Sequence, residues 1–370
     1  MSRIARPSSL ALAALAAVAG STFAPAAAAQ QQPATEFTWY GRIDMAMERG
    51  SNGNVNRTML QNFSSRLGIR GEHKLSDSLS GVFQVETGIA PDDTTQSKTL
   101  ASRNSFVGLK SAPAGTVIAG THDMPLKTLG ATMYSLWGEG DLEEVIIHGK
   151  GSRAAIGSAN FDNVHTRKTG VLLYTSPKLF NTVAKLAYSP DEAKVNAAGA
   201  VPTYAKSMWG ASAEYNDGLF NGGLAYQNQD NYIAPTATVA GSAMKGLKAI
   251  FGVKVDTLFA GVEFSRLDNS RGKKTKNVLA TANYGVGDYT FKASFGHSSS
   301  SSDGADDAVN AAGLEADYAF DKQFTLYTYY TRIINAKNAK GSFAAADNFP
   351  AVVNAGDDPR ALGVGIRYTF

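Results

Sequence analysis

The last ten residues, 361–370, alternate strictly between two kinds of side chain. One row consists of small or polar residues, and the other is entirely apolar or aromatic: Leu362, Val364, Ile366, Tyr368 and Phe370. Successive side chains of a β-strand point to opposite faces. In water the apolar face would be an exposed patch beside an open edge, whereas a bilayer requires such a surface. The segment predicts a membrane-spanning strand, with the edge strand of a soluble sandwich as the alternative.

The first residues have the charged and apolar parts of a secretory signal. Arg3 and Arg6 precede the apolar run 10–19, which leads to a stretch of small residues. A membrane helix needs roughly 20 apolar residues, and this run is shorter. We expect residues 1–29 to be cleaved and residues 30–370 to form a single domain. An uncleaved anchor is the alternative.

Composition excludes several classes of function. The chain has no Cys, so an exported form has no disulfide scaffold and no thiolate metal site. Its net charge is +3, and removal of Arg3 and Arg6 leaves 33 basic against 32 acidic residues. A balance of +1 gives no global attraction to nucleic acid. Any electrostatic function must therefore come from charged residues that are clustered locally in the fold.

Three early segments alternate with period two and carry polar rows opposite their apolar rows. The polar rows are Tyr40, Arg42, Asp44 and Glu48 in residues 38–48; Arg66, Arg70, Glu72 and Lys74 in residues 65–75; and Gln84 and Glu86 in residues 79–89. A dry core accepts charges only when they are paired. A water-filled lumen accepts them readily, so the pattern predicts strands between lipid and an aqueous interior.

The same periodicity recurs to the end of the chain, with short and long connections alternating. We expect about sixteen strands, namely 38–48, 65–75, 79–89, 103–110, 115–123, 169–177, 180–189, 206–216, 219–228, 244–255, 258–267, 276–286, 289–298, 311–320, 323–335 and 361–370. Asp, Asn and Gly supply the tight turns. An even number of strands with tight turns at one end is typical of an outer-membrane barrel. The predicted fold class is therefore all-β, a transmembrane antiparallel β-barrel of about sixteen strands, wide enough for an aqueous channel.

Several short motifs also carry a family resemblance, which extends in order from about Phe37 to Phe370. They are residues 39–44 (WYGRID), 65–72 (SRLGIRGE), 82–86 (VFQVE), 107–109 (VGL), 174–177 (YTSP), 317–320 (DYAF) and 364–370 (VGIRYTF). Together they resemble the Gram-negative general porins, in particular the neisserial and betaproteobacterial branch. The resemblance implies a homotrimer, a third loop folded into the lumen as a constriction, and passive diffusion of ions and small hydrophilic solutes through the outer membrane.

The longest connection, residues 124–168, is the third long loop and carries a run of carboxylates. They are Glu139, Asp141, Glu143 and Glu144. A structureless loop of this length is unusual unless it is functional and packed against something, which in this family is the inner wall. The run therefore predicts an acidic rim of the constriction, with a solvated acidic turn as the alternative.

The family places a basic cluster on the wall opposite such a rim. Arg42, Arg66 and Arg70 have the inward phase on the first two strands and would serve; otherwise they line the lumen or pair with Glu72 and Glu86. Arg103 is a fourth candidate, although its phase relative to Val107 puts it outward unless the strand is bulged. Opposed charges across a narrow gap create a transverse field that acts on dipolar solutes.

Two departures from the family pattern bear on the width and charge of the constriction. Residues 120–122 read Gly-Thr-His where the family commonly has Gly-Arg-Gln, and the family's Pro-Glu-Phe-Gly tip is not recognisable near residues 135–140.

The expected partners are a homotrimer, outer-membrane lipid with lipopolysaccharide, and the barrel assembly machinery, which would recognise Phe370. The basic stretch 266–276 contacts lipopolysaccharide phosphates or forms a solvated loop. No pair of histidines has the spacing of a zinc helix motif, and we expect no enzymatic activity, cofactor or nucleic acid. Two alternative functions stay open: a surface-binding or structural barrel with a closed pore, acting as an adhesin or receptor, and a substrate-specific porin.

Overall fold

The computed structural model describes residues 36–92, 99–130, 136, 138, 141–147, 164–190, 205–233, 238, 240–268, 274–343, 349–350 and 354–370. For Glu144, Ile147 and Ile233 it describes the backbone alone. The expected signal segment 1–29 lies outside the described residues. Among the described residues, no helix is long and apolar enough to cross a bilayer.

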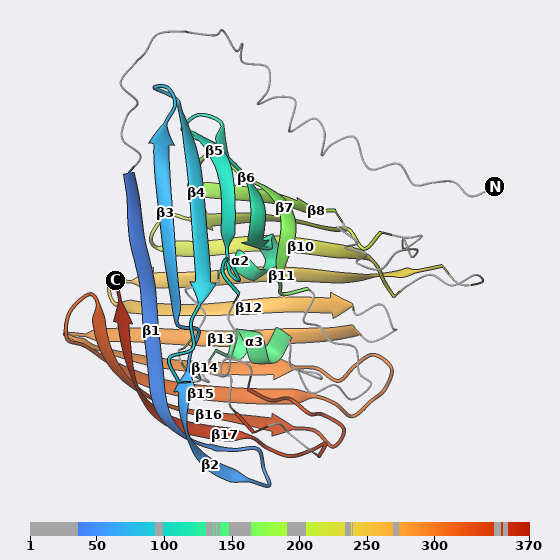
Figure 1. Cartoon of the computed structure of the whole chain (residues 1–370). Helices are drawn as coiled ribbons and strands as arrows, with labels where there is room; N and C mark the ends of the chain where they lie inside the picture. Colours follow the sequence, from blue (N-terminus) through green and yellow to red (C-terminus); the bar gives the residue numbers. More distant parts are fainter. Residues whose placement is uncertain are drawn as a thin grey trace.

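One antiparallel sheet contains the described strands and closes on itself (Figure 1). The strands are β1 (Glu36–Ser51), β2 (Asn56–Asn62), β3 (Arg66–Lys74), β4 (Leu79–Gly88), β5 (Ser105–Ser111), β6 (Gly115–Asp123), β7 (Arg167–Thr175), β8 (Thr182–Ser189), β9 (Met208–Asn216), β10 (Phe220–Ile233), β11 (Ser242–Val255), β12 (Leu258–Asp268), β13 (Lys274–Val286), β14 (Tyr289–Ser298), β15 (Val309–Ala319), β16 (Phe324–Asn335) and β17 (Arg360–Thr369). Each predicted strand has a counterpart here.

The short strand β2 was not predicted from the sequence. β1 pairs with β2 along residues 45–51 and with β3 along residues 36–42, so β2 and β3 occupy one position in the barrel wall. The described sheet of 17 segments is therefore a closed barrel of sixteen strand positions. Ser64, between β2 and β3, has a φ of 58°, and this left-handed residue breaks the alternation on which the prediction depended.

The wall closes where β17 pairs with β1. Phe370 donates its backbone N–H to the Gly41 carbonyl at 3.1 Å, and Gly41 donates back to Phe370 at 2.9 Å. A Cβ at Gly41 would lie 2.5 Å from the Phe370 ring, so only glycine leaves room for the terminal aromatic ring beside the seam. Lipid cannot satisfy an open strand edge, which makes this closure a requirement of the fold.

The two faces of β17 divide as the alternation predicts. Leu362 and Val364 are each 55 % exposed on the outer face, whereas Arg367 on the inner face is 6 % exposed. The inner guanidinium is 2.9 Å from Asp44 Oδ2 of β1. The terminal segment is therefore a wall strand with its apolar row outward, and the soluble-sandwich alternative is wrong.

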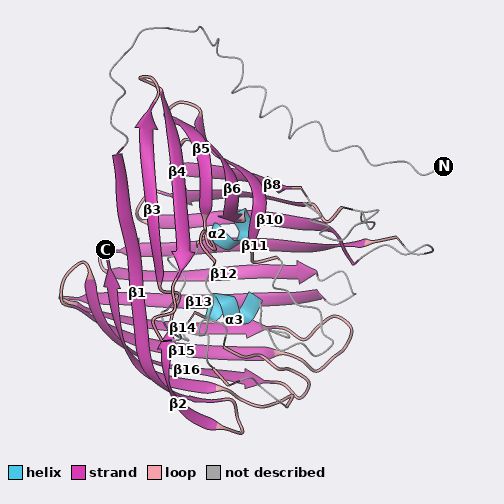
Figure 2. Cartoon of the chain, viewed as in Figure 1, coloured by secondary structure: helices cyan, strands magenta, loops and turns pink. Residues whose placement is uncertain are grey.

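The described parts of the segment between β6 and β7 lie inside the barrel. They include two short helices, α2 (Pro125–Thr128) and α3 (Leu142–Ile147), drawn within the circle of strands in Figure 2. α2 contacts strands β8 to β11, and α3 contacts β13 to β15. The predicted folding of the third loop into the lumen is confirmed.

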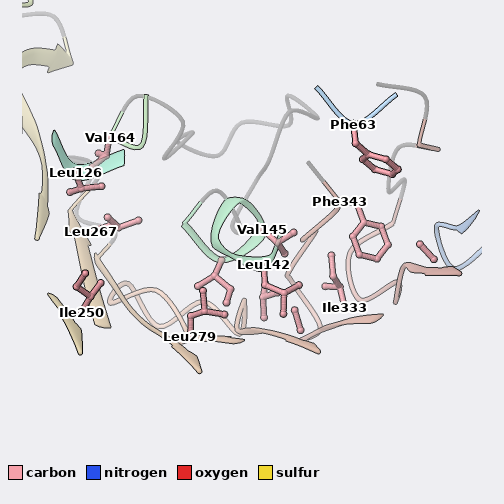
Figure 3. Close-up of a cluster of buried hydrophobic side chains, with 14 of the residues drawn as sticks. Phe63, Leu126, Leu142, Val145, Val164, Ile250, Leu267, Leu279, Ile333 and Phe343 are labelled. Carbon is pink, nitrogen blue, oxygen red and sulfur yellow. The ribbon is translucent and has the colours of Figure 1, made fainter. Parts of the chain in front are cut away.

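Apolar side chains hold this loop against the wall (Figure 3). Leu126, Leu142 and Val145 are each at most 1 % exposed, and they share one buried cluster with inward residues of the wall such as Leu279 and Ile333. Burying a side chain of this size contributes about 1.5–3 kcal/mol. The described helices of the loop are therefore packed in the lumen as part of the folded core.

Candidate functional site

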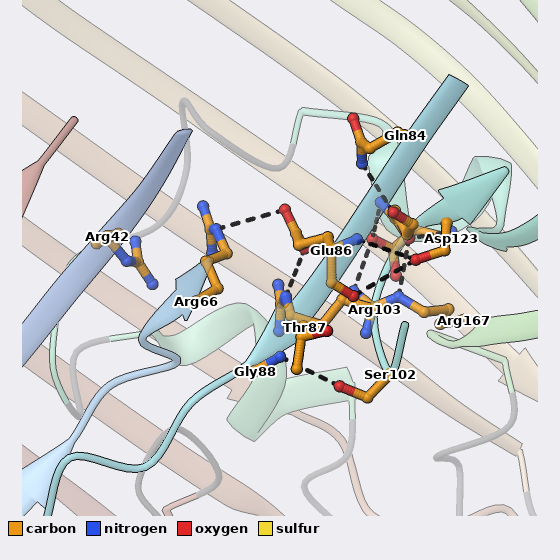
Figure 4. A network of polar contacts seen from close by, with 12 residues as sticks. Arg42, Arg66, Gln84, Glu86, Thr87, Gly88, Ser102, Arg103, Asp123 and Arg167 are labelled. Atoms are coloured by element: carbon orange, nitrogen blue, oxygen red, sulfur yellow. Dashed lines mark hydrogen bonds and ion pairs between the residues drawn. The ribbon is translucent and has the colours of Figure 1, made fainter. Parts of the chain in front are cut away.

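Four arginines project from the inner wall on the first strands, and we call them the arginine belt: Arg42 of β1, Arg66 of β3, Arg103 before β5, and Arg167 of β7 (Figure 4). Arg42 and Arg66 are register partners, so their side chains leave neighbouring strands at one level. The sequence analysis placed Arg42, Arg66, Arg70 and Arg103 in one group. The structure brings three of these together, and Arg70 lies apart from them.

Glu86 of β4 lies between two members of the belt. Its Oε1 accepts a hydrogen bond from Arg103 Nε at 2.6 Å, and its Oε2 lies 3.8 Å from Arg66 Nε. The pairing with Glu86 that the sequence analysis left open is therefore present for Arg66, and Arg103 makes the same pairing without its having been predicted. Because the Glu86 side chain is 9 % exposed, it stabilises the belt from within the wall.

The second carboxylate of the belt is Asp123, at the end of β6 where the third loop begins. Arg167 donates Nη2 to Asp123 Oδ2 at 3.1 Å and Nε to Asn104 Oδ1 at 2.8 Å. Asn104 in turn donates to Asp123 Oδ2 at 2.9 Å. This triad places the belt at the level from which the loop turns inward.

The belt has an excess of positive charge. Four guanidinium groups face the two carboxylates Glu86 and Asp123, a difference of +2. Asp44 does not change the balance, because although it lies 3.8 Å from Arg42 it is hydrogen-bonded to a fifth arginine, Arg367, at 2.9 Å. Counting both of these gives five positive against three negative charges, again +2.

Strand phase alone predicted that Arg103 points outward, unless the strand is bulged. In the structure β5 begins only at Ser105, so Arg103 lies outside the strand and its side chain need not follow the in–out alternation of β5. Its backbone N–H donates to the Glu86 carbonyl at 3.0 Å while its side chain reaches the Glu86 carboxylate. The irregular backbone before β5 thus turns Arg103 into the lumen.

Arg70 lies apart from the belt. It is four residues from Arg66 along β3, about 13 Å at the usual rise of a strand, and its guanidinium lies 5.0 Å from the centre of the Tyr40 ring. The Tyr40 hydroxyl donates to Glu86 Oε2 at 3.0 Å. Arg70 therefore lines the lumen nearer the short-turn end.

The four predicted carboxylates of the third loop fall into different situations. Glu139 and the side chain of Glu144 lie outside the described residues. Asp141 is half-buried immediately before α3. Glu143 is 3 % exposed and turns toward the barrel wall. The role of these carboxylates and of the four predicted arginines in the constriction stays a prediction.

Glu143 belongs to a buried ionic cluster, which we call the loop anchor: Glu143, His165, Lys248 and Glu263. The Lys248 ammonium contacts Glu143 Oε1 and lies 3.2 Å from Glu263 Oε2 on the neighbouring strand. His165 Nε2, on the returning arm of the loop, lies 2.8 Å from the same Glu143 oxygen. The anchor therefore joins both arms of the loop to β11 and β12.

Burial and charge act in opposite directions on Glu143. Burial alone would raise its pKa, but the positive charge of Lys248 and the contact with His165 lower the pKa to about 2. Glu143 is consequently ionised at neutral pH, and Lys248 compensates its charge.

Two further contacts, made by residues near the middle of the loop, fix its position against the barrel wall. Ile146 of α3 fills the space above Gly296 of β14, where a Cβ would lie 1.6 Å from the Ile146 Cδ1 atom. Further along the wall, Gly138 lies against the Tyr329 ring. The Tyr329 hydroxyl donates to Glu48 at 2.5 Å, so the loop also rests on a wall side chain that is itself fixed.

Sequence reasoning missed Arg167 and Lys248. Arg167 fell inside the segment 124–168 assigned to the loop, although β7 begins at that residue. Lys248 has the inward phase of β11, between Gly246 and Ile250, so alternation could have indicated its direction. Its partner Glu143 is 105 positions away, and only the fold shows that they meet.

The comparisons with known proteins decide the family. A family model described as Gram-negative porin matches residues 11–339. The chain belongs to the Gram-negative porin family. It is 27 % identical over 343 residues to outer membrane porin N of Escherichia coli K12, covering 82 % of this chain and 85 % of that protein. It is 26 % identical over 321 residues to major outer membrane protein P.IB of Neisseria gonorrhoeae, covering 78 % and 85 %.

Solved porin structures have the same fold. An anion-selective porin from Comamonas acidovorans superposes with a TM-score of 0.75 at 20 % identity, over 91 % of this chain and all of that one. Salmonella typhi OmpF gives a TM-score of 0.63 at 16 % identity, over 90 % of this chain and 97 % of that one.

This porin therefore forms a channel in the outer membrane for the passive diffusion of solutes. The family, fold class, channel function and location expected from the sequence are confirmed. Family membership indicates a channel as opposed to an enzyme.

Proposed function

We propose that the constriction lies between the arginine belt and the third loop, and that ions and small hydrophilic solutes pass through it with anions favoured. One observation supports the preference most directly: the belt has an excess charge of +2, whereas Lys248 already compensates Glu143 of the loop. The similar structure from Comamonas acidovorans is described as an anion-selective porin, which agrees with the proposed preference for anions.

The mechanism combines size exclusion with an electrostatic field and needs no cofactor or energy input. A solute that enters the gap loses part of its hydration shell, and the guanidinium groups of the belt replace it for anions and polar groups. An apolar solute gains no such replacement. Charge at the belt therefore selects among solutes that the width of the gap admits.

Single-channel recording in a planar bilayer tests this function. We expect discrete conductance steps and, across a salt gradient, a reversal potential of the sign that anion permeation gives. A cation-selective potential would contradict the proposed preference while leaving the channel intact. Folded protein that gives no conductance would contradict the open pore and favour the surface-binding or structural barrel.

We also propose that the mature protein comprises residues 30–370 and assembles as a homotrimer. A trimer form is described for one of the similar structures, OmpT of Vibrio cholerae, whose TM-score is 0.62. Sedimentation of the detergent-solubilised protein would give the oligomeric state directly. Steps that close in thirds would agree with a trimer, and a monomer in sedimentation would overturn the proposal.

The proposal extends to biogenesis. Phe370 closes the seam with Gly41, and we propose that before closure it is the residue that the barrel assembly machinery recognises. Phe370→Ala should then reduce assembly in cells more than refolding of the purified chain into detergent. Equal losses in both would assign Phe370 to stability alone.

A further inference from the structure

The Tyr40 side chain reaches across a neighbouring strand to the carboxylate of the arginine belt. Tyr40 of β1, Gly68 of β3 and Glu86 of β4 are register partners in one row of the wall. A Cβ at Gly68 would lie 2.4 Å from Tyr40 Cζ, so the ring lies over the Gly68 backbone. Its hydroxyl donates to Glu86 Oε2 at 3.0 Å. The missing side chain at Gly68 thus lets a tyrosine on β1 bind a carboxylate two strands away.

This hydroxyl binds the Glu86 oxygen that is nearer to Arg66. Oε1 accepts a hydrogen bond from Arg103 Nε at 2.6 Å, whereas Arg66 Nε lies 3.8 Å from Oε2, on the other side of the carboxylate (Figure 4). A separation of 3.8 Å is longer than a hydrogen bond. The Arg66 side chain also keeps 29 % exposure, the largest value among the four belt arginines. Glu86 is therefore bonded to Tyr40 and Arg103 and lies beside Arg66 without such a bond.

The same arrangement recurs at the seam of the barrel. Asp44 accepts hydrogen bonds from the Tyr327 hydroxyl at 2.6 Å and from Arg367 Nε at 2.9 Å. Arg42 Nε lies 3.8 Å from this carboxylate. In both places a carboxylate is bonded to one tyrosine and one arginine, and a second arginine lies 3.8 Å away. The two second arginines, Arg42 and Arg66, are register partners.

We propose that Tyr40 is a positioning residue for selectivity: its hydroxyl holds Glu86 away from Arg66, so that the Arg66 guanidinium faces passing anions. This inference rests on the proposed constriction at the arginine belt. A carboxylate that closes on an arginine forms charge-assisted hydrogen bonds and occupies N–H groups that an anion would use. Tyr40 therefore sets how much of the positive charge of the belt a solute meets, although it carries no charge itself.

The burial of Glu86 determines what happens when the hydroxyl is removed. Its side chain is 9 % exposed, so water replaces a lost hydrogen bond only in part. The guanidinium of Arg66 is the donor already closest to Oε2 on that side, and a movement of about 1 Å brings the two within hydrogen-bond distance. Loss of the Tyr40 hydroxyl should therefore close the ion pair between Glu86 and Arg66.

Tyr40→Phe tests the proposal without changing the formal charge or removing the ring. The anion-to-cation permeability ratio, measured as the reversal potential across a salt gradient, should fall about two- to threefold, as expected for the loss of about one effective charge in water. Tyr215→Phe is the matched control. The Tyr215 hydroxyl also donates to a carboxylate, Asp217 Oδ2 at 2.8 Å, but at an exposed short turn, so this variant should keep the wild-type reversal potential.

A double-mutant cycle distinguishes positioning from a merely structural role of Tyr40. Glu86→Gln alone should raise the preference for anions, because it removes a negative charge from the belt. Tyr40→Phe in the Glu86→Gln background should then change the reversal potential no further, because no carboxylate remains to close on Arg66. A structural role would give the same shift in both backgrounds. Unchanged heat-modifiability on gels would show that each variant folds.

The outcomes separate this inference from the proposed function. An unchanged reversal potential in Tyr40→Phe, or an equal shift in the Glu86→Gln background, would overturn the role of Tyr40. If neutralising Arg42, Arg66 and Arg103 together shifts the reversal potential while Tyr40→Phe does not, the constriction stands and the positioning role alone fails. If neither variant shifts it, both proposals fail.

Discussion

The two halves of the inner wall are built from the same alternating strands but use their inward rows differently. On β1 to β7 the inward row holds the arginine belt, where the Arg42 and Arg66 side chains retain 12 % and 29 % exposure. On β11 to β16 it holds apolar residues together with buried ionic groups such as Lys248, whose side chain is fully buried beneath the loop. What covers an inward side chain therefore decides whether it serves the channel or the fold.

This difference has an energetic consequence. The guanidinium groups of the belt keep partial contact with water, so losing one costs less than the roughly 3–5 kcal/mol expected when one partner of a fully buried pair is removed and the other charge is left unpaired. We therefore expect changes in the loop anchor to alter stability and changes in the belt to alter selectivity.

Lys248→Met should have the largest effect. It leaves Glu143 and Glu263 buried without compensation, so we expect a loss of about 3–5 kcal/mol in the free energy of unfolding, measured by urea titration with circular dichroism. Lys254→Met, an exposed change on the same strand, is the control. Replacing Lys248, Glu143 and Glu263 together by Met should recover most of the loss. If Lys248→Met is as stable as the control, the anchor does not hold the loop.

Neutralising the belt should change selectivity instead. Arg42→Gln, Arg66→Gln and Arg103→Gln combined convert the excess charge from +2 to −1. With about 0.5 kcal/mol for each charge at roughly 8 Å in water, the permeability to a monovalent anion should fall about tenfold, and the anion-to-cation permeability ratio should fall further because cation entry becomes easier. The reversal potential measures it. Arg70→Gln, outside the belt, should have a smaller effect, and an equal effect of the two variants would remove the special role of the belt.

Amide substitutions in the third loop test the acidic side of the proposed constriction, as the belt variant tests its basic side. Replacing Glu139, Asp141, Glu143 and Glu144 together by amides should shift selectivity toward anions, raising the permeability to a monovalent anion about threefold at one or two effective charges. Glu143→Gln alone should change stability with little effect on selectivity, because Glu143 is buried. An unchanged reversal potential in the quadruple variant would place the loop carboxylates outside the constriction.

Acid should release the anchor only at low pH. The folded pKa of Glu143 is lowered from 4.5 to about 2, so its contribution to stability is complete above about pH 4.5 and is lost as the pH falls toward 2. Proteolysis of the loop between pH 6 and 2.5 would monitor the release. The Glu143→Gln variant should lack this component, and an identical pH profile in both proteins would show that another group controls the loop.

Sequence patterns predicted the wall well because each strand must satisfy lipid and water at once. The terminal apolar row and the inward direction of Arg42 and Arg66 both follow from a period of two residues. The pattern failed where the backbone leaves that period: at Ser64, which separates β2 from β3, and before Ser105, where Arg103 turns inward. In such places local backbone conformation decides direction.

The sequence by itself determined that this protein is a lipid-facing barrel with a charged lumen, since alternation and the membrane fix which side each residue faces. Only the tertiary structure decided which charges remain beside water. Glu143 and Lys248 are far apart in the chain and meet because the loop folds back on β11. A pattern along one strand carries no information about a contact made across the lumen, so the division between belt and anchor had to come from the fold.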